Sequence, residues 1–260
     1  MNRASSSPSA DQRREGAATP GRDDADAKTL LRIVPCFAEL TPDVLTTIAA
    51  RCRSRSFRAG QFVFVEGDLC RHLYILESGR VKFFRASAEG REQILRVFER
   101  PGDTFCIPSA FHAGRHIVSG GAVSETRLYL LDVGTVNRLA HEHPSVAMKL
   151  VATAGEHMAY LVALAEDLSL KTATARLAKY LHGLAVAEGA EPGKTIRLSR
   201  DRLLEEELAA MVGTVRVHIS RSLLNLVQAG AIDLTRGFVQ VHDLTVLKRI
   251  AEGDRPQIRP

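Results

Sequence analysis

The stretch of sequence with the clearest chemical purpose runs from Leu208 to Leu224 and has the pattern of two short helices joined by a turn. Apolar residues recur at helical spacing on both sides of Gly213, which supplies a tight turn between the helices. The second helix buries its apolar stripe and leaves other side chains exposed in its N-terminal half, where a recognition helix contacts base edges in the DNA major groove. The candidate DNA contacts are Thr214, Arg216, Val217, His218, Ser220 and Arg221.

These side-chain types suit recognition of a DNA duplex. Arg pairs bidentately with guanine, and Ser and Thr bind phosphate oxygens or base edges. We expect Thr214 also to cap the second helix, and Glu205, Glu206 and Glu207 to face solvent on the preceding helix. From Lys171 to the C-terminus, 14 Lys and Arg stand against 10 Asp and Glu, which is compatible with a polyanionic partner. The alternative interpretation is an ordinary helical subdomain with a solvated basic face.

A second candidate chemistry lies in the thiols. The four cysteines, at positions 36, 52, 70 and 106, form no CxxC pair and show no short metal-ligand spacing. The N-terminus lacks the apolar core of a signal peptide, and no apolar run approaches the ~20 residues that cross a bilayer. We therefore expect a cytoplasmic protein with free thiols and no membrane partner.

Hydrophobic patterning places these groups on an α+β fold. Residues 1–27 are poor in large apolar side chains, and we expect a disordered tail there. A helical pattern follows from Leu30 to Cys52, and short apolar runs broken by glycines from Phe57 to Asp132 predict a compact all-β sandwich or roll. The expected boundaries are a β-roll sensor domain at 28–143, a dimerisation helix at 144–169, a winged helix-turn-helix domain at 170–252 and a tail at 253–260.

The dimerisation helix is predicted to start near Pro144. Its apolar residues recur at alternating spacings of 4 and 3 from Ala147 to Leu168, which is the heptad pattern of a two-helix seam. A helix that packs only on its own domain usually shows a wider apolar stripe, so we favour a parallel contact between two copies of the chain. The predicted contact residues are Val151, Ala154, Met158, Leu161 and Ala165.

Five short motifs resemble the β-roll of the cyclic AMP receptor protein/fumarate-nitrate regulator (CRP/FNR) family. They are FRAG at 57–60, VEGD at 65–68, LY at 73–74, SGRV at 78–81 and PGDTF at 101–105, and the long helix and helix-turn-helix follow in the family's order. The resemblance implies an N-terminal double-stranded β-helix (a cyclic-nucleotide-binding-like β-roll) and a homodimer. It also implies transcription control at a near-palindromic duplex, with RNA polymerase as a partner if the protein is an activator.

The sequence departs from the family's cyclic-nucleotide-binding members at two places, the ligand-binding segment and the DNA-recognition helix. Ile107 stands at the position of the ribose-binding Glu, and His116 stands near the phosphate-binding pair, with Arg115 next to it. Loss of a charged phosphate partner in a buried pocket weakens binding strongly, so cyclic AMP is not expected unless Arg115 turns toward the phosphate. In the recognition helix Val217 replaces a common Glu, which predicts an altered half-site because Val contacts a thymine methyl and accepts no hydrogen bond.

The sequence leaves the effector open. Phe105 to Ser109 resembles the segment that supplies a Cys ligand in the family's carbon-monoxide-sensing haem member, which makes Cys106 a candidate haem ligand, although Pro108 replaces that member's nearby His. The alternatives are a redox-active thiol, an unidentified organic ligand, or a Cys106 that is simply buried. The candidate effector-pocket residues are Cys106, Ile107, Ser109, His112, Arg115, His116 and His157.

Other classes of function find less support in the sequence. It contains no nucleophile elbow, phosphate-binding Gly loop or HExxH motif, so we do not expect an enzyme. The remaining alternative is a cyclic-nucleotide-type regulatory module that acts through a protein partner, and the appended winged helix argues against it.

Overall fold

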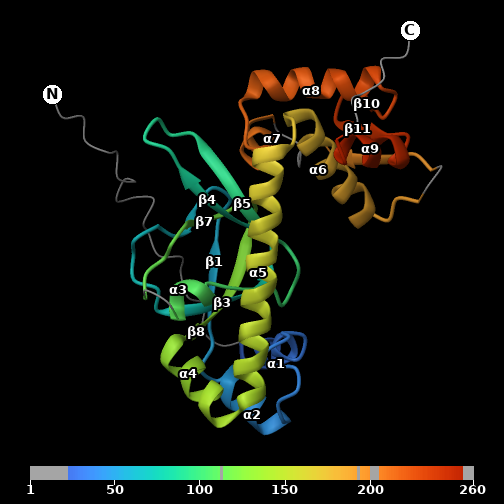
Figure 1. Cartoon of the computed structure of the whole chain (residues 1–260). Helices are drawn as coiled ribbons and strands as arrows, with labels where there is room; N and C mark the ends of the chain where they lie inside the picture. The colour runs from blue at the N-terminus through green and yellow to red at the C-terminus, as the bar shows by residue number, and fades with distance from the viewer. Residues whose placement is uncertain (1–22, 112–113, 192–193, 200–204, 254–260) are drawn as a thin grey trace, which may run out of the picture. The chain divides into compact units, whose positions relative to one another are not determined.

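The computed structural model describes residues 23–111, 114–191, 194–199 and 205–253 (Figure 1). These residues form two compact units that divide within the long helix α5 (Pro144–Leu170), between Tyr160 and Leu161. The predicted site residue His112 lies outside the described residues. Within the described part of the chain, no helix combines the length and apolar character needed to cross a membrane.

The first unit is a β-roll, which confirms the predicted fold class (Figure 1). Its described residues make two four-stranded sheets, with strand orders β1-β8-β3-β6 and β2-β7-β4-β5, so strands distant in sequence lie side by side. Successive side chains of a strand point to opposite faces, and β3 and β8 are buried on both faces because one face lines the roll and the other packs against helices. The strands are β1 (Arg53–Phe57), β2 (Phe62–Phe64), β3 (His72–Ser78), β4 (Val81–Ala86), β5 (Glu92–Phe98), β6 (Thr104–Phe105), β7 (Ser119–Ala122) and β8 (Thr126–Asp132).

The interior of the roll is lined with aromatic rings. Tyr74 stacks on Phe105 with a centroid distance of 5.4 Å, and it lies at the same distance from Phe64. Phe98 packs on Phe105 at 5.0 Å. The short helix α3 (Ile107–Phe111) follows β6 directly. Any group held inside the roll near these rings is therefore shielded from water.

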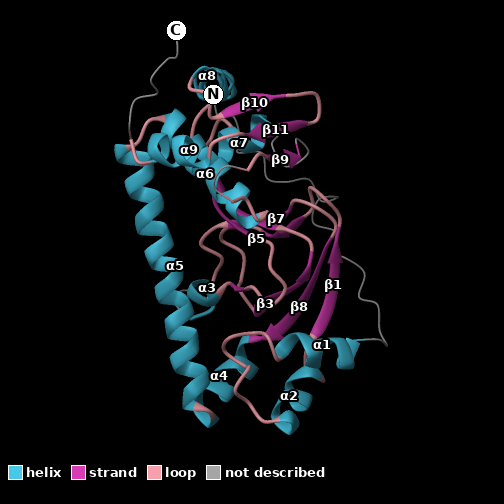
Figure 2. Cartoon of the chain, turned by 90° about the vertical axis from the view of Figure 1, so that its right-hand side faces the viewer, coloured by secondary structure: helices cyan, strands magenta, loops and turns pink. Residues whose placement is uncertain are grey.

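Three helices cover the other face of the β1-β8-β3-β6 sheet and share a core with the first turns of α5 (Figure 2). They are α1 (Asp23–Leu31), α2 (Pro42–Ala49) and α4 (Val133–Glu142). Two expectations need correction. Residues 23–27, assigned to the disordered tail, are helical, and Ala27 is buried in this core. The helical pattern from Leu30 to Cys52 is broken by turns before α2, because Pro42 cannot continue a helix and instead begins one.

The second unit is a winged helix-turn-helix. A three-stranded sheet of order β10-β11-β9 packs with the helices around one apolar core. The sequence analysis missed the last helix, which Asp243 caps by accepting hydrogen bonds from the amides of Thr245 and Val246. The elements are α6 (Ala173–Ala187), β9 (Ile196–Ser199), α7 (Glu205–Val212), α8 (Arg216–Gln228), β10 (Ile232–Leu234), β11 (Phe238–Val241) and α9 (Leu244–Ala251).

Candidate nucleic-acid interface and sensor cluster

Helix α8 presents one face to solvent and buries the other. Ile219, Leu223 and Leu226 are buried in the core of the second unit, as their spacing predicted. Gly213 has a φ of 72°, the left-handed conformation that glycine adopts without strain, and it makes the turn between α7 and α8. Both views show α8 along an outer face of this unit (Figures 1 and 2). The fold therefore leaves the N-terminal half of α8 accessible to a duplex.

The residues predicted to contact DNA differ in their exposure to solvent. Val217 is 68% exposed, and Arg216, His218 and Arg221 are also exposed, whereas Thr214 and Ser220 are half-buried. The prediction that Thr214 caps α8 is wrong. Val215 occupies the cap position without a side-chain hydrogen bond, and the Thr214 hydroxyl lies 3.2 Å from His218 Nδ1 instead.

Glu205 holds Arg216 in place, and the sequence analysis missed this contact. Arg216 Nε donates to Glu205 Oε2 at 2.9 Å, and the Ser220 hydroxyl donates to the same oxygen at 3.3 Å. This hydrogen bond raises the pKa of the Arg216 guanidinium. The expectation that Glu205 faces solvent is therefore wrong, while Glu206 is largely exposed. Glu205, the first residue of α7, lies within reach of α8 because the two helices meet at a sharp turn.

Arg176 on α6 ties the helix-turn-helix to the end of α5. Its Nε donates to the Val212 carbonyl at 2.6 Å and its Nη2 to the Gly213 carbonyl at 3.2 Å. Its Nη1 donates to the Lys171 carbonyl at 2.6 Å. These acceptors are otherwise orphan groups at helix ends. One guanidinium thus fixes the turn before α8 relative to the C-terminal end of α5.

Within the first unit, three buried side chains meet inside the β-roll. Cys70 precedes β3, Cys106 lies between β6 and α3, and His116 precedes β7. Their exposed fractions are 6%, 2% and 3%. Cys106 Sγ lies 3.7 Å from His116 Nδ1, and Cys70 Sγ lies 4.0 Å from the Cys106 carbonyl oxygen. The structure thus joins two predicted effector residues, Cys106 and His116, with a third that the sequence analysis left unassigned.

The two thiols of this cluster are not equivalent. A hydrogen bond from Cys106 lowers the pKa of Cys70 to about 5, against the opposing effect of burial. Burial raises the pKa of Cys106 well above its ordinary value. The Cys70 thiol therefore loses its proton more readily than the Cys106 thiol.

The His116 ring is held by its neighbours. It stacks on Phe64 with centroids 3.9 Å apart and planes 10° from parallel. Phe64 in turn covers Gly120 of β7, where a Cβ would overlap the Phe64 ring. The Phe64 stack therefore fixes the plane of the imidazole, while Nδ1 at the ring edge contacts Cys106.

The remaining effector candidates lie apart from this cluster or point elsewhere. Ile107 and Ser109 are buried in α3, and the Ser109 hydroxyl accepts a hydrogen bond from the Ile117 amide at 3.4 Å. Arg115 is exposed and donates to the Gly67 carbonyl at 2.8 Å, so it does not turn toward the interior.

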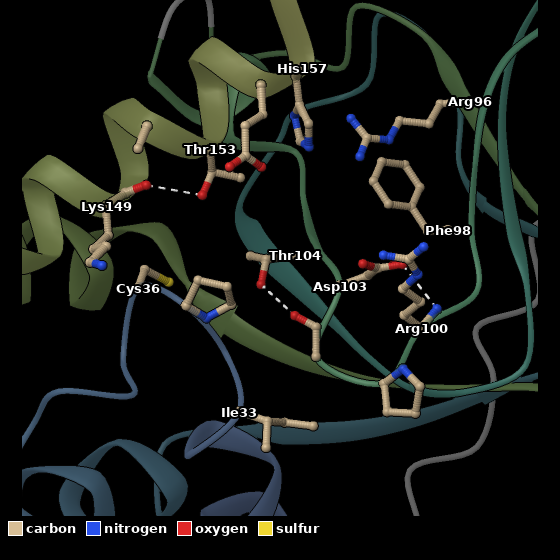
Figure 3. A pocket seen from close by; sticks show the side chains of 15 residues that line it. Ile33, Cys36, Arg96, Phe98, Arg100, Asp103, Thr104, Lys149, Thr153 and His157 are labelled. Carbon is tan, nitrogen blue, oxygen red and sulfur yellow. Dashed lines mark hydrogen bonds between the residues drawn. The ribbon is translucent and has the colours of Figure 1, made fainter. Parts of the chain in front are cut away.

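His157 lines a pocket of about 340 Å³ between β5, the segment after it and α5 (Figure 3). Figure 3 shows Arg96, Phe98 and His157 on one side of this pocket and Lys149 and Cys36 on another. Burial and the nearby Arg96 lower the pKa of His157. Burial raises the pKa of Cys36 to about 12, which leaves it a neutral thiol. His157 and the buried cluster are therefore separate features of the first unit.

The outer face of α5 carries an uncovered apolar stripe. Val151 and Met158 are each 66% exposed and Leu161 is 47% exposed, as expected of contact residues in a seam. Ala154 instead packs against the core of the first unit, in line with the buried Leu150 one turn earlier. The exposed stripe keeps the alternating spacings of 3 and 4 residues, but it runs through Gly155 and Val162 where the prediction has Ala154 and Leu161. The stripe comprises Met148, Val151, Gly155, Met158, Val162 and Ala165.

Comparisons with known proteins agree with both units. Residues 54–143 match the family described as "Cyclic nucleotide-binding domain", and residues 175–250 match "Crp-like helix-turn-helix domain". The cyclic AMP receptor protein of Thermus thermophilus is 31% identical over 219 residues, which cover 84% of this chain and 97% of that protein. The chain belongs to the CRP/FNR family.

Further relatives within CRP/FNR support the same assignment. A CRP-like cAMP-activated global transcriptional regulator of Mycobacterium tuberculosis is 28% identical over 83% of this chain and 95% of its own length. The crystal structure of a CRP/FNR transcriptional regulator from Thermus thermophilus covers 78% of this chain and 99% of its own, with 25% identity and a TM-score of 0.60. The protein is thus a DNA-binding transcription regulator of CRP/FNR type.

Proposed function

We propose that this CRP/FNR protein is a homodimer that binds a near-palindromic duplex through two copies of α8 and responds to an effector in its β-roll. The observation that carries the proposal is the exposed N-terminal half of α8, which begins directly after the Gly213 turn. A recognition helix contacts base edges with these positions. A dimer with two such helices recognises two half-sites related by its own symmetry.

The half-site is proposed to differ from that of family members with a Glu in the recognition helix. Val217 is exposed on α8, where it contacts a thymine methyl rather than accepting from cytosine. Arg221 is exposed and suits guanine or phosphate, and Arg216 reaches a base or phosphate once it leaves Glu205. His218 and Ser220 add hydrogen bonds at the same helix end.

The dimer contact is proposed to form along the exposed stripe of α5. Large apolar side chains such as Met158 and Val162 are 66% and 64% exposed in the single chain, and a contiguous patch of this kind marks an interaction surface. Gly155 and Ala165 in the same stripe allow two helices to approach closely. A heptad stripe of this length favours a parallel pair.

The effector is proposed not to be cyclic AMP, although two relatives are named for it. Ile107 carries no ribose-binding carboxylate, and His116 and Cys106 fill the interior near the expected phosphate position. Arg115, the residue that could compensate, is committed to the Gly67 carbonyl. Haem fits this arrangement poorly, because the Cys106 thiol is 2% exposed and faces protein atoms rather than an open cleft. A regulator of this type acts on chromosomal DNA in the cytoplasm, and with RNA polymerase where it activates.

The test is selection of duplex sites from a random pool by the full-length protein and by Val217→Glu. We expect the wild type to select a palindrome whose half-site differs at one base pair from that selected by Val217→Glu. We also expect duplex affinity to fall steeply with salt concentration. Identical half-sites for the two proteins would refute the role of Val217, and selection of no palindrome would refute dimeric DNA reading.

A further inference from the structure

Three metal-ligand side chains from separate segments converge inside the β-roll. The ligand atoms of Cys70, Cys106 and His116 all lie within 4.8 Å of one another, and all three residues are buried. They are distant enough in sequence that only the folded roll brings them together. Burial of three such groups at one point is costly unless they bind one another or a ligand.

One edge of the cluster matches the edge of a metal-centred tetrahedron, and all three ligand atoms lie within 4.8 Å of one another. Bonds of about 2.3 Å to sulfur and about 2.0–2.1 Å to nitrogen place neighbouring ligand atoms about 3.6–3.8 Å apart. Cys106 Sγ and His116 Nδ1 are 3.7 Å apart, so this edge already has the metal-bound length. A disulfide would use only the two sulfur atoms and would leave the aligned imidazole without a role.

The surroundings hold these groups in position before any ligand arrives. Cys106 has a φ of 72°, and among the described residues it alone adopts a positive φ without being glycine. Such strain persists only where the neighbouring structure enforces it, and it marks functional positions. The stack of His116 on Phe64 fixes the plane of the imidazole ring. Two of the three ligands are therefore pre-oriented by independent features.

The charge of the three ligand groups and the softness of the two sulfur atoms indicate which class of metal ion the site would bind. Two thiolates and a neutral imidazole carry two negative charges, and the walls of the site include the rings of Phe64 and Tyr74. A divalent cation neutralises this charge, whereas Cu⁺ leaves one negative charge uncompensated in a dry interior. Thiolate ligands select thiophilic ions over Mg²⁺ or Ca²⁺.

We propose that Cys70, Cys106 and His116 bind one thiophilic divalent cation of the zinc class inside the β-roll. Binding forms two metal–sulfur bonds and one metal–nitrogen bond. The Cys106 thiol, and any Cys70 still protonated, release their protons to solvent. The three protein ligands leave a fourth coordination position for an external ligand. This deepens the proposed function by naming the effector class, and the binding itself requires no DNA.

The experiment uses the full-length protein, purified with reductant, stripped with a chelator and titrated with Zn²⁺ or Co²⁺ alone. We expect about one ion per chain, and with Co²⁺ a thiolate-to-metal charge-transfer band with the visible bands of a tetrahedral site. Cys70→Ser and His116→Gln should each weaken metal binding by at least about 100-fold. Loss of a residue that only hydrogen-bonds to a metal ligand weakens binding by at most about that factor. Cys52 lies outside the cluster, so Cys52→Ser is the matched control and should bind the metal ion as the wild type does.

Several outcomes would overturn the site. They are binding well below one ion per chain, a Co²⁺ spectrum without sulfur charge transfer, equal loss in Cys52→Ser, and binding of Cu⁺ but not Zn²⁺. A Cys70–Cys106 disulfide in protein purified without reductant, together with no metal binding by the reduced protein, would assign a redox role instead. Circular dichroism checks that each variant folds. If Cys70→Ser does not fold, His116→Gln, which keeps both thiols, still tests the site. Metal binding that persists in a protein without duplex binding would refute the proposed function and leave the site intact.

Discussion

Replacing Arg176 by Met should loosen the helix-turn-helix without altering its exposed surface. The guanidinium donates to the carbonyls of Val212 and Lys171 at 2.6 Å and to that of Gly213 at 3.2 Å. A hydrogen bond from a charged donor contributes about 1.5–3 kcal/mol. The side chain is only half-buried, so water reaches part of the vacated site, and we take the low end for the two shortest bonds. The expected loss is about 3 kcal/mol.

Hydrogen–deuterium exchange of the full-length protein measures this loss locally. A loss of about 3 kcal/mol in the opening of α7 and α8 speeds exchange there by about two orders of magnitude. The matched control is Lys179→Met on the same helix, which removes one ion pair, with Asp167, but no hydrogen bond to the turn before α8. It should leave exchange in α7 and α8 unchanged. Unchanged protection in Arg176→Met, or the same change in both variants, would show that the carbonyl contacts do not hold the turn.

Three further predictions concern the α5 stripe, the recognition helix and pH. Met158→Lys should raise the dimer dissociation constant more than about 100-fold, because about 1.5–3 kcal/mol of hydrophobic stabilisation is lost in each of the two copies. Analytical ultracentrifugation measures the constant, and Ala159→Lys, at an exposed position, is the control. An unchanged constant in Met158→Lys would contradict a dimer contact along this stripe. Glu205→Gln frees Arg216 from a solvent-exposed ion pair, so affinity for random duplex should rise up to about fivefold in fluorescence anisotropy. Weaker binding would mean that Glu205 assists recognition. Burial raises the pKa of Asp167, but hydrogen bonds from Lys179 and Lys171 outweigh it and lower the pKa. The contribution of Asp167 to the free energy of unfolding is therefore present above the unfolded pKa near 4 and is lost as pH falls through the folded pKa. Urea unfolding of the wild type and of Asp167→Asn should give different stabilities at neutral pH and similar ones in acid, and a difference that grows in acid refutes the assignment.

Much of the fold could be predicted because its signals are local. Short apolar runs separated by glycine turns predicted the β domain, and Gly213 with its flanking apolar stripes predicted the helix-turn-helix. The last helix was missed although its signal was present: Asp243 caps it, and Leu244, Leu247 and Ile250 follow at helical spacing. The spacing in α5 did not reveal that Ala154 packs against the core of the first unit, because that core is assembled from segments distant in sequence.

The site residues that escaped prediction depend on contacts between segments distant in sequence. Cys70 and Cys106 are brought together only by the roll, and no spacing rule marks such a pair. Glu205 reaches Arg216 because α7 and α8 cross steeply, which a count of charges does not reveal. Arg176 looked like an ordinary surface cation of an amphipathic helix, yet its partners are backbone carbonyls that carry no sequence signature.

Gly120 links the packing of one sheet to the chemistry of the buried cluster. It belongs to β7 and touches no ligand atom, but the ring of Phe64 lies where its Cβ would be. Even an alanine at this position would push Phe64 against the His116 ring, since the two rings are already stacked. The affinity of the cluster for whatever it binds could thus be retuned during evolution by a single methyl group on a neighbouring strand, with every coordinating residue left in place.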